Sequence, residues 1–281
     1  MPRAATALRA GFARGLIELR QSFTGGELVG QLLWPVATLL AIFFLRNRGF
    51  GASGFTLGVL ALPSVLGMFI AFGTLLMVQY LSAEREDGTL LRARATPNGI
   101  RGYFIGKLVT ASGSILVYLA ILLVPGLLLV DGLQVGRVGS WLTLAWVLLL
   151  GLVATQSLGA ILGSLVSSPR GAGYLSLPIM GLVAISGIFY PITALPEWLR
   201  WIAQTFPMYW LGLGMRSALL PDDAVAVELG ASWRHLETAG VLGAWALLGL
   251  IVAPMVLRRM ARRESGSSVA ARRDKLLQRI G

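Results

Sequence analysis

Residues 57–81 read LGVLALPSVLGMFIAFGTLLMVQYL, a stretch that contains no Asp, Glu, Lys, Arg or His. As an α-helix, a stretch of this length crosses the roughly 30 Å hydrocarbon core of a bilayer. Five other segments are also free of ionisable residues and long enough to cross a bilayer: residues 28–45, 108–130, 141–166, 171–189 and 239–257. We therefore predict an all-α membrane protein with six transmembrane helices.

The overall composition supports this prediction. Of the 281 residues, 56% are hydrophobic and only 13% are charged, and the mean hydropathy is +0.74. A soluble protein carries about 25% charged residues, so the excess apolar surface must face lipid. The chain has no Cys and a single His, His235, which excludes a disulfide, a thiolate metal site and a multi-histidine site within one chain. We predict a single transmembrane domain, residues 1–257, without a metal.

The basic residues predict the orientation in the cytoplasmic membrane. If the N-terminus lies inside, eighteen of the Lys and Arg residues fall on the cytoplasmic side and six on the outer side. The positive-inside rule then places both termini in the cytoplasm. We interpret the basic tail, residues 258–281, as a topology anchor that contacts lipid headgroups, and we expect no nucleic-acid partner.

The N-terminal segment has the pattern of an amphipathic helix. One helical stripe is apolar, and the Arg residues lie off it. The stripe consists of Leu8, Phe12, Leu16, Leu19 and Phe23. A helix on the inner membrane face and a helix packed on a partner both fit the pattern, and the two can hold together. No short apolar core with a cleavage site precedes it, so we expect no cleaved signal peptide.

The chain shows no means of driving transport by itself. Ion-coupled carriers need ionisable residues or broken-helix ion sites near the midplane, and the six predicted spans contain no ionisable residue. The only Gly-Lys pair, Gly106-Lys107, lacks the other residues of a phosphate-binding loop. Any ATP chemistry therefore belongs to another polypeptide.

The loop after the second predicted span reads EREDGTLLRARATP, residues 84–97. We expect Gly88 to end the helix that leaves the membrane, Thr89 to cap a new short helix, and Pro97 to bias the preceding residue away from helical geometry. A short, rigid cytoplasmic helix between two spans can transmit a partner's motion into the membrane. A solvated loop helix would show the same charge pattern.

Two sets of short motifs, in this order and spacing, resemble the permeases of type-2 ABC transporters, in particular the daunorubicin-resistance type. The first is Glu84-Arg85-Glu86-x-Gly88-Thr89-Leu90, followed by Pro97, Tyr103 and Gly106-Lys107. The second is SGIFYP at 186–191, LPEWL at 195–199 and Phe206-Pro207. With the six spans, the resemblance covers nearly the whole chain.

The resemblance implies partners and a coupling site. The family's coupling helix docks on a cytoplasmic ATPase subunit that binds ATP and Mg, while the permease pairs with a second copy or a close homologue. The implied coupling residues are Glu84, Arg85, Glu86, Gly88, Thr89, Leu90 and Leu91. No catalytic site or cofactor is expected in this chain.

The resemblance also implies a re-entrant helical hairpin on the outer face, about residues 191–220. Its marker residues are Pro191, Pro196, Trp198, Leu199 and Pro207. Its apolar stripe is too short to span a bilayer, and Trp198, Trp201, Tyr209 and Trp210 suit the headgroup interface. A plain aromatic belt without a gate is the alternative.

The implied path for cargo lies along the first, second and fifth spans. Candidate lining residues are Met68, Phe69, Phe72, Ile185, Phe189 and Tyr190. Gly159 and Gly163 predict close packing of the fourth span within the chain, and Gln79 and Gln156 could hydrogen-bond between helices.

Charge-free spans suit an amphiphilic cargo, because an unpaired charge at the bilayer centre costs at least about 2.5 kcal/mol. We predict the permease of an ATP-driven exporter of a drug, an antibiotic or a lipid-like molecule. Export of a polysaccharide or a lipid-linked glycan and a non-transport membrane scaffold are alternatives. A rhomboid-like intramembrane protease is suggested only by Gly51-Ala52-Ser53-Gly54, and neither Ser53 nor His235 is placed for catalysis.

Overall fold

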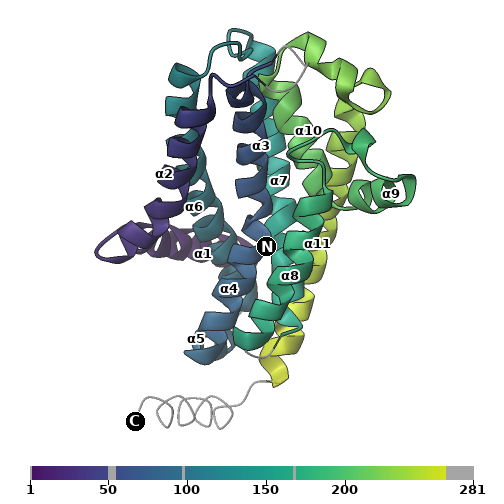
Figure 1. The fold of residues 1–281 in the computed structure, drawn as a ribbon. Helices are drawn as coiled ribbons and strands as arrows, with labels where there is room; N and C mark the ends of the chain where they lie inside the picture. The colour runs from purple at the N-terminus through teal and green to yellow at the C-terminus, as the bar shows by residue number, and fades with distance from the viewer. Residues whose placement is uncertain (1, 50–54, 97–98, 167–168, 264–281) are drawn as a thin grey trace.

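The structure, a computed structural model, describes residues 2–49, 55–96, 99–166 and 169–263. Within these ranges the regular elements are helices, and one isolated β-bridge joins Gly49 and Thr56. The long helices run side by side, and helix α1 (Pro2–Ser22) lies across them (Figure 1). The prediction of an all-α membrane protein is confirmed. The Gly51–Gly54 motif, Pro97 and residues 264–281 of the basic tail lie outside the described residues.

Five helical segments of the described chain are long and apolar enough to cross a membrane. They are α2 (Glu27–Leu45), α3 (Leu57–Ala71) continued by α4 (Gly73–Glu86), α6 (Gly99–Leu129), α7 (Val138–Ser164) and α11 (His235–Arg263). The chain is therefore a multi-pass membrane protein. The fifth predicted span, residues 171–189, corresponds to α8 (Pro169–Ile185), which is not among these five; α8 has 17 residues and ends before Gly187, whose φ is +67°.

Several helices continue beyond the apolar stretches that predicted them. α6 begins at Gly99 rather than near residue 108, and α4 continues past residue 81 to Glu86. Hydropathy reports the thickness of the hydrocarbon layer, whereas backbone hydrogen bonding can continue into water. As a result, α6 contains Lys107, which the predicted span excluded.

The hairpin region folds into two short helices with different surroundings. α9 (Glu197–Thr205) projects from the side of the bundle, whereas α10 (Pro207–Leu219) packs against α3, α7 and α11 (Figure 1). The expected interfacial position of Tyr209 and Trp210 is wrong, because their exposed fractions are 0% and 3%. The indole Nε1 of Trp210 donates to the Gln204 carbonyl at 2.7 Å, which allows this ring to be buried.

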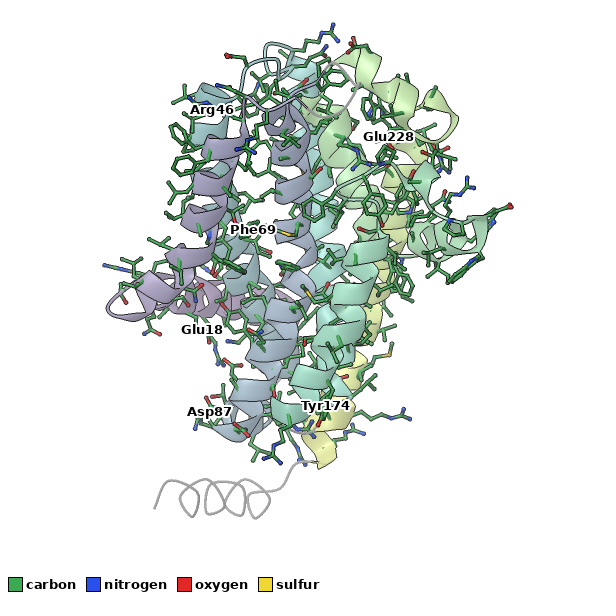
Figure 2. All side chains as sticks on the ribbon, viewed as in Figure 1. Glu18, Arg46, Phe69, Asp87, Tyr174 and Glu228 are labelled. Carbon is green, nitrogen blue, oxygen red and sulfur yellow. The ribbon has the colours of Figure 1, made fainter. Side chains whose placement is uncertain are left out.

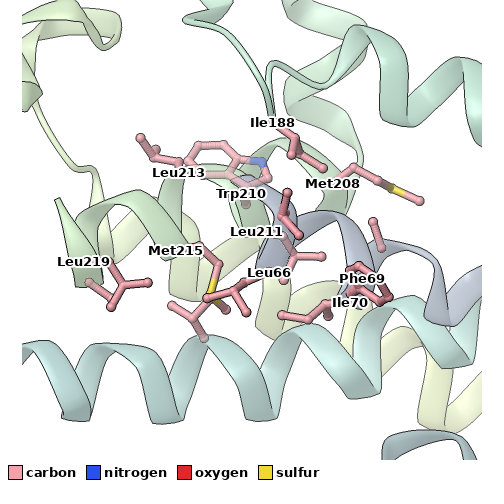
Figure 3. Close-up of a cluster of buried hydrophobic side chains, with 14 of the residues drawn as sticks. Leu66, Phe69, Ile70, Ile188, Met208, Trp210, Leu211, Leu213, Met215 and Leu219 are labelled. Carbon is pink, nitrogen blue, oxygen red and sulfur yellow. The ribbon is translucent and has the colours of Figure 1, made fainter. Parts of the chain in front are cut away.

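The main hydrophobic core surrounds α10. Figure 3 shows side chains of α10 meeting those of α3 and the Ile188 side chain. Short 3-10 turns η1 (Ile192–Ala194), η2 (Asp222–Val227) and η3 (Leu229–Ala231) connect the outer segments. A second, smaller core joins α4, α5 (Thr89–Arg94), α6, α7 and α11 at the opposite end.

α1 packs on α6 through small residues. A Cβ at Gly11 would lie 2.4 Å from the Gly102 carbonyl oxygen, and one at Gly15 would lie 2.5 Å from that of Gly106. The apolar residues Leu8, Phe12 and Leu16 remain exposed. One face of α1 therefore packs within the chain, while most of the apolar stripe is exposed; the position of α1 on the inner membrane face stays a prediction.

The predicted close packing of α7 within the chain is confirmed. A Cβ at Gly159 would lie 2.3 Å from the Thr74 carbonyl oxygen of α4, so the two backbones approach closely there. Gln156 of α7 hydrogen-bonds to the Ser112 hydroxyl of α6, as anticipated for a polar residue inside a span. Gln79 lies exposed in a groove between α4 and α8.

Candidate functional site

The predicted coupling segment contains a six-residue helix, α5. Gly88 has φ +77°, a conformation that favours glycine, and it separates α5 from α4. Thr89 is not the cap, contrary to the sequence prediction. The Asp87 carboxylate accepts a hydrogen bond from the Thr89 N–H at 2.7 Å, while the Thr89 hydroxyl accepts one from Arg92. The carboxylate of Asp87, two residues before Thr89, therefore satisfies the first free N–H of the helix.

α5 has a buried face and an exposed face. Thr89, Leu90 and Ala93 are buried, and Leu90 is only 2% exposed in the smaller core. Leu90 is one of the implied coupling residues, and its burial places it on the face that holds α5 on its own chain. Arg92 is exposed and available to a partner.

Two polar contacts and one apolar contact hold α5 and the end of α4 against other parts of the chain. The Arg94 guanidinium donates to the Ala261 carbonyl of α11 at 3.0 Å. Arg85, near the end of α4, donates to the Val166 carbonyl just after α7. The smaller core adds contacts with α6. Since α5 is held at several points, a displacement of it would pass to several long helices.

A buried charge cluster links the end of α4 to α1. Lys107 of α6 has a side chain only 5% exposed, and its Nζ lies 2.5 Å from the Glu18 carboxylate. It also pairs with Glu84 of α4. The Glu18 carboxylate accepts further hydrogen bonds from Arg14 at 2.8 Å and from the Thr110 hydroxyl at 3.3 Å. Three helices therefore share one network of alternating charges.

The pKa of the Glu18 carboxyl reflects its pairing with Lys107 and Arg14. Burial raises its pKa, but the hydrogen bonds and positive charges of Lys107 and Arg14 outweigh burial and lower the pKa below its ordinary value of 4.5. The carboxylate thus stays ionised at neutral pH. Sequence reasoning missed this cluster, although two signals pointed to it: Glu18 is the only acidic residue in the first 26 positions, and Lys107 directly precedes an apolar span.

The structure does not bring the six candidate path residues together. Phe69 is 5% exposed in the main core, where its ring centroid lies 6.1 Å from that of Tyr118. Met68 and Phe72 pack against the same core. Phe189 and Tyr190 instead line a pocket of about 430 Å³ at the opposite end from α5, and Ile185 ends α8.

The hairpin markers lie at helix boundaries and on the surface. Pro196 is the N-cap residue of α9, and Pro207 is the first residue of α10. Trp198 and Trp201 are 65% and 68% exposed, in agreement with an interfacial position. α9 is tied to α11, because the Trp245 Nε1 donates to the Thr205 carbonyl at 2.9 Å. Pro191 and Leu199 are half-buried beside them.

Both ends of the molecule carry charged side chains. Figure 2 shows Asp87 and Tyr174 near one end, Arg46 and Glu228 near the other, and Glu18 at an intermediate level. The charge cluster of Glu18, Glu84 and Lys107 therefore lies between the end that carries α5 and the middle of the bundle.

Comparison with known families agrees with this arrangement. Residues 38–255 match the family described as ABC-2 family transporter protein, which covers more than half of the chain. No curated protein matches the sequence. A permease of this family is a transporter component that works with a separate ATPase subunit and has no catalytic site of its own. The chain therefore belongs to the ABC-2 family, as the membrane-spanning permease subunit of an ABC transporter.

Proposed function

We propose that this permease exports an amphiphilic small molecule, a drug or a lipid-like compound, across the cytoplasmic membrane, driven by an ATPase subunit that docks on α5. The observation that carries the proposal is the anchored helix α5, which is buried on one face and exposed on the other. ATP and Mg belong to the partner subunit. A second permease copy completes the transporter, as the family resemblance implies.

The contacts of α5 support a coupling role. A push on its exposed face reaches α4 through Asp87, α11 through Arg94, and α6 through the buried Leu90. Because packed helices shift as rigid units, a small displacement at α5 would move several spans together. In α5 and just before it, Asp87 and Arg92 are exposed and meet the partner, whereas the buried Thr89 and Leu90 transmit the motion.

The charge cluster extends this route to the membrane surface. Glu84 and Lys107 connect the end of α4 to α6, and Glu18 continues the connection to α1. If α1 lies at the inner interface through Leu8, Phe12 and Leu16, then α5 lies beyond that interface, in the cytoplasm (Figure 1). Both termini are then cytoplasmic, as the distribution of basic residues predicts.

We propose that α8 also crosses the membrane, as the fifth of six spans, because its 17 residues form an apolar helix. Figure 1 shows α9 projecting from the bundle at an intermediate level, so its exposed Trp198 and Trp201 face lipid, and α10 leads the chain from there toward the end opposite α5. This arrangement keeps the hairpin of the family, with only its first half facing lipid.

The test is reconstitution of the chain with its ATPase subunit and measurement of cargo-stimulated ATP hydrolysis. Arg92 is exposed on α5, so Arg92→Glu places a negative charge where a partner would dock. We expect it to weaken assembly by about tenfold, or about 1.4 kcal/mol. The matched control is Arg48→Glu, a charge reversal at an exposed Arg beyond the far end of α2. Equal assembly and equal stimulation in both variants would show that α5 is not the docking site.

A further inference from the structure

The pocket at the outer end has both apolar walls and a polar floor. Its volume is about 430 Å³, within the range of small-molecule sites. The beginning of α3, the segment after α8, the end of α10 and η2 form its walls. Phe55, Leu60, Phe189 and Val227 supply apolar surface.

Arg216 and Glu228 line the same pocket and form an ion pair that is almost entirely buried. Their side chains are 7% and 2% exposed, and the Arg216 Nε lies 2.6 Å from a Glu228 carboxylate oxygen. Arg216 Nη1 donates to the carbonyls of Gly187 and Ile188, both at 3.0 Å. These bonds fix the guanidinium in place, so the polar floor is preorganised.

Each member of the pair keeps one buried atom without a hydrogen-bond partner. These atoms are Nη2 of Arg216, which is a donor, and Oε2 of Glu228, which is an acceptor. Burying unsatisfied polar atoms costs free energy, so a ligand that satisfies both gains affinity. A hydroxyl or carboxamide can accept from Nη2 and donate to Oε2 through one group.

The charge balance selects against ionised ligands. Arg216 and Glu228 neutralise each other, and the remaining charged residue of the lining, Asp223, is exposed at the rim. An anion would meet the Glu228 carboxylate, and a cation would meet the guanidinium, each without a surplus of opposite buried charge. A neutral polar group avoids both penalties.

We propose that this pocket binds an uncharged amphiphile, with its hydroxyl or carboxamide on Arg216 and Glu228 and its apolar part against Phe55, Leu60 and Phe189. The inference names a ligand class for the outer end of the proposed exporter and in that sense rests on the proposed function. Binding to the pocket requires neither ATP hydrolysis nor transport, so the ligand proposal and the proposed export function can each fail without the other.

The experiment uses the full chain in lipid nanodiscs, with its ATPase subunit and without nucleotide. Three probes share one decyl tail with a terminal diazirine and differ only in the head: alcohol, carboxylate or ammonium. After photolysis, peptide mapping locates the label. We expect the alcohol to label residues 55–64 and 220–228 about tenfold more than either charged probe. Equal labelling by all three probes, or preference for a charged one, would overturn the proposal.

Two variants separate binding from folding. Ala61 lines the pocket and is half-buried, so Ala61→Trp should fill it and abolish the alcohol label while leaving the ion pair intact. Leu247→Trp, at a residue of α11 that is 65% exposed, is the matched control and should label as the wild type does. The paired change Arg216→Met with Glu228→Met should remove the preference for alcohol over the charged probes. Undiminished labelling of Ala61→Trp would show that the ligand binds elsewhere.

Discussion

Lys107 is the centre of the charge cluster that joins α1, α4 and α6. Its side chain is 5% exposed and pairs with two carboxylates from different helices. A buried cation is tolerated only when its partners compensate for lost hydration. Removing it would leave Glu18 and Glu84 facing each other across the interface of α1, α4 and α6.

We expect Lys107→Met to lower the free energy of unfolding by about 2–3 kcal/mol, less than for a fully buried pair because both carboxylates are partly exposed. Thermal unfolding in detergent measures the effect. Arg14→Met, at the more exposed end of the same network, is the control and should cost no more than about 0.5 kcal/mol. Equal losses in the two variants would contradict the assignment of Lys107 as the centre of the cluster.

Glu18 makes the stability of the charge cluster depend on pH. Its pKa in the folded protein is lowered from 4.5, so its stabilising contribution is complete above about pH 4.5 and is lost as the pH falls through the lowered value. Glu18→Gln should therefore be less stable than wild type at neutral pH. The difference in melting temperature should shrink on acidification below about pH 4. A difference independent of pH would mean that the carboxylate charge does not matter.

At the level of residues, the sequence indicated which segments matter better than which way their side chains face. The motif around Gly88 predicted a break followed by a short helix, and the structure has both. The burial of Leu90 and Trp210 could not be read from the motif, because burial depends on which neighbouring helix covers a face. The pairing of Glu18 with Lys107 joins positions far apart in the chain, so the local signals at each residue did not show that the two side chains meet.

Among the helices, the sequence predicted the close packing of α7, which the structure shows to be against α4. Its glycine spacing was visible because small residues at a fixed helical interval form one groove. The partner helix was not visible, since many apolar helices could enter such a groove. α10 was the element predicted least well, because a short apolar helix looks the same whether it meets lipid or protein.

Gly159→Ala tests the close contact between α7 and α4. Its new Cβ would lie 2.3 Å from a backbone oxygen of α4, so the helices must separate, at a cost of about 1–3 kcal/mol. Gly181→Ala in α8 is the control, because a Cβ there meets nothing within 4 Å. The control should be neutral or slightly stabilising, since Ala favours helix over Gly. Melting temperatures of the two variants give the answer, and a similar small shift in both would argue against close packing.

For the molecule as a whole, orientation in the membrane is the prediction with the widest consequences. The chain contains no Cys, so single cysteines can be introduced without a background. Ala95→Cys, just after α5, should be protected from an impermeant maleimide in intact cells, whereas Ser140→Cys, near the start of α7, should react. Permeabilised cells should label both. The reverse pattern in intact cells would place α5 outside and remove the basis for coupling to a cytoplasmic ATPase.

The fastening of α1 to α6 through Gly11 and Gly15 has a consequence for the surrounding lipid. Because α1 cannot slide along α6, the distance from α1 to the ends of the spans farthest from α5 is constant. A bilayer of different thickness must then stretch or compress to match this distance, at a modest cost for each ångström of mismatch. We therefore expect this permease to be most stable in membranes of one hydrophobic thickness, and its stability to change with the acyl-chain length of the lipid.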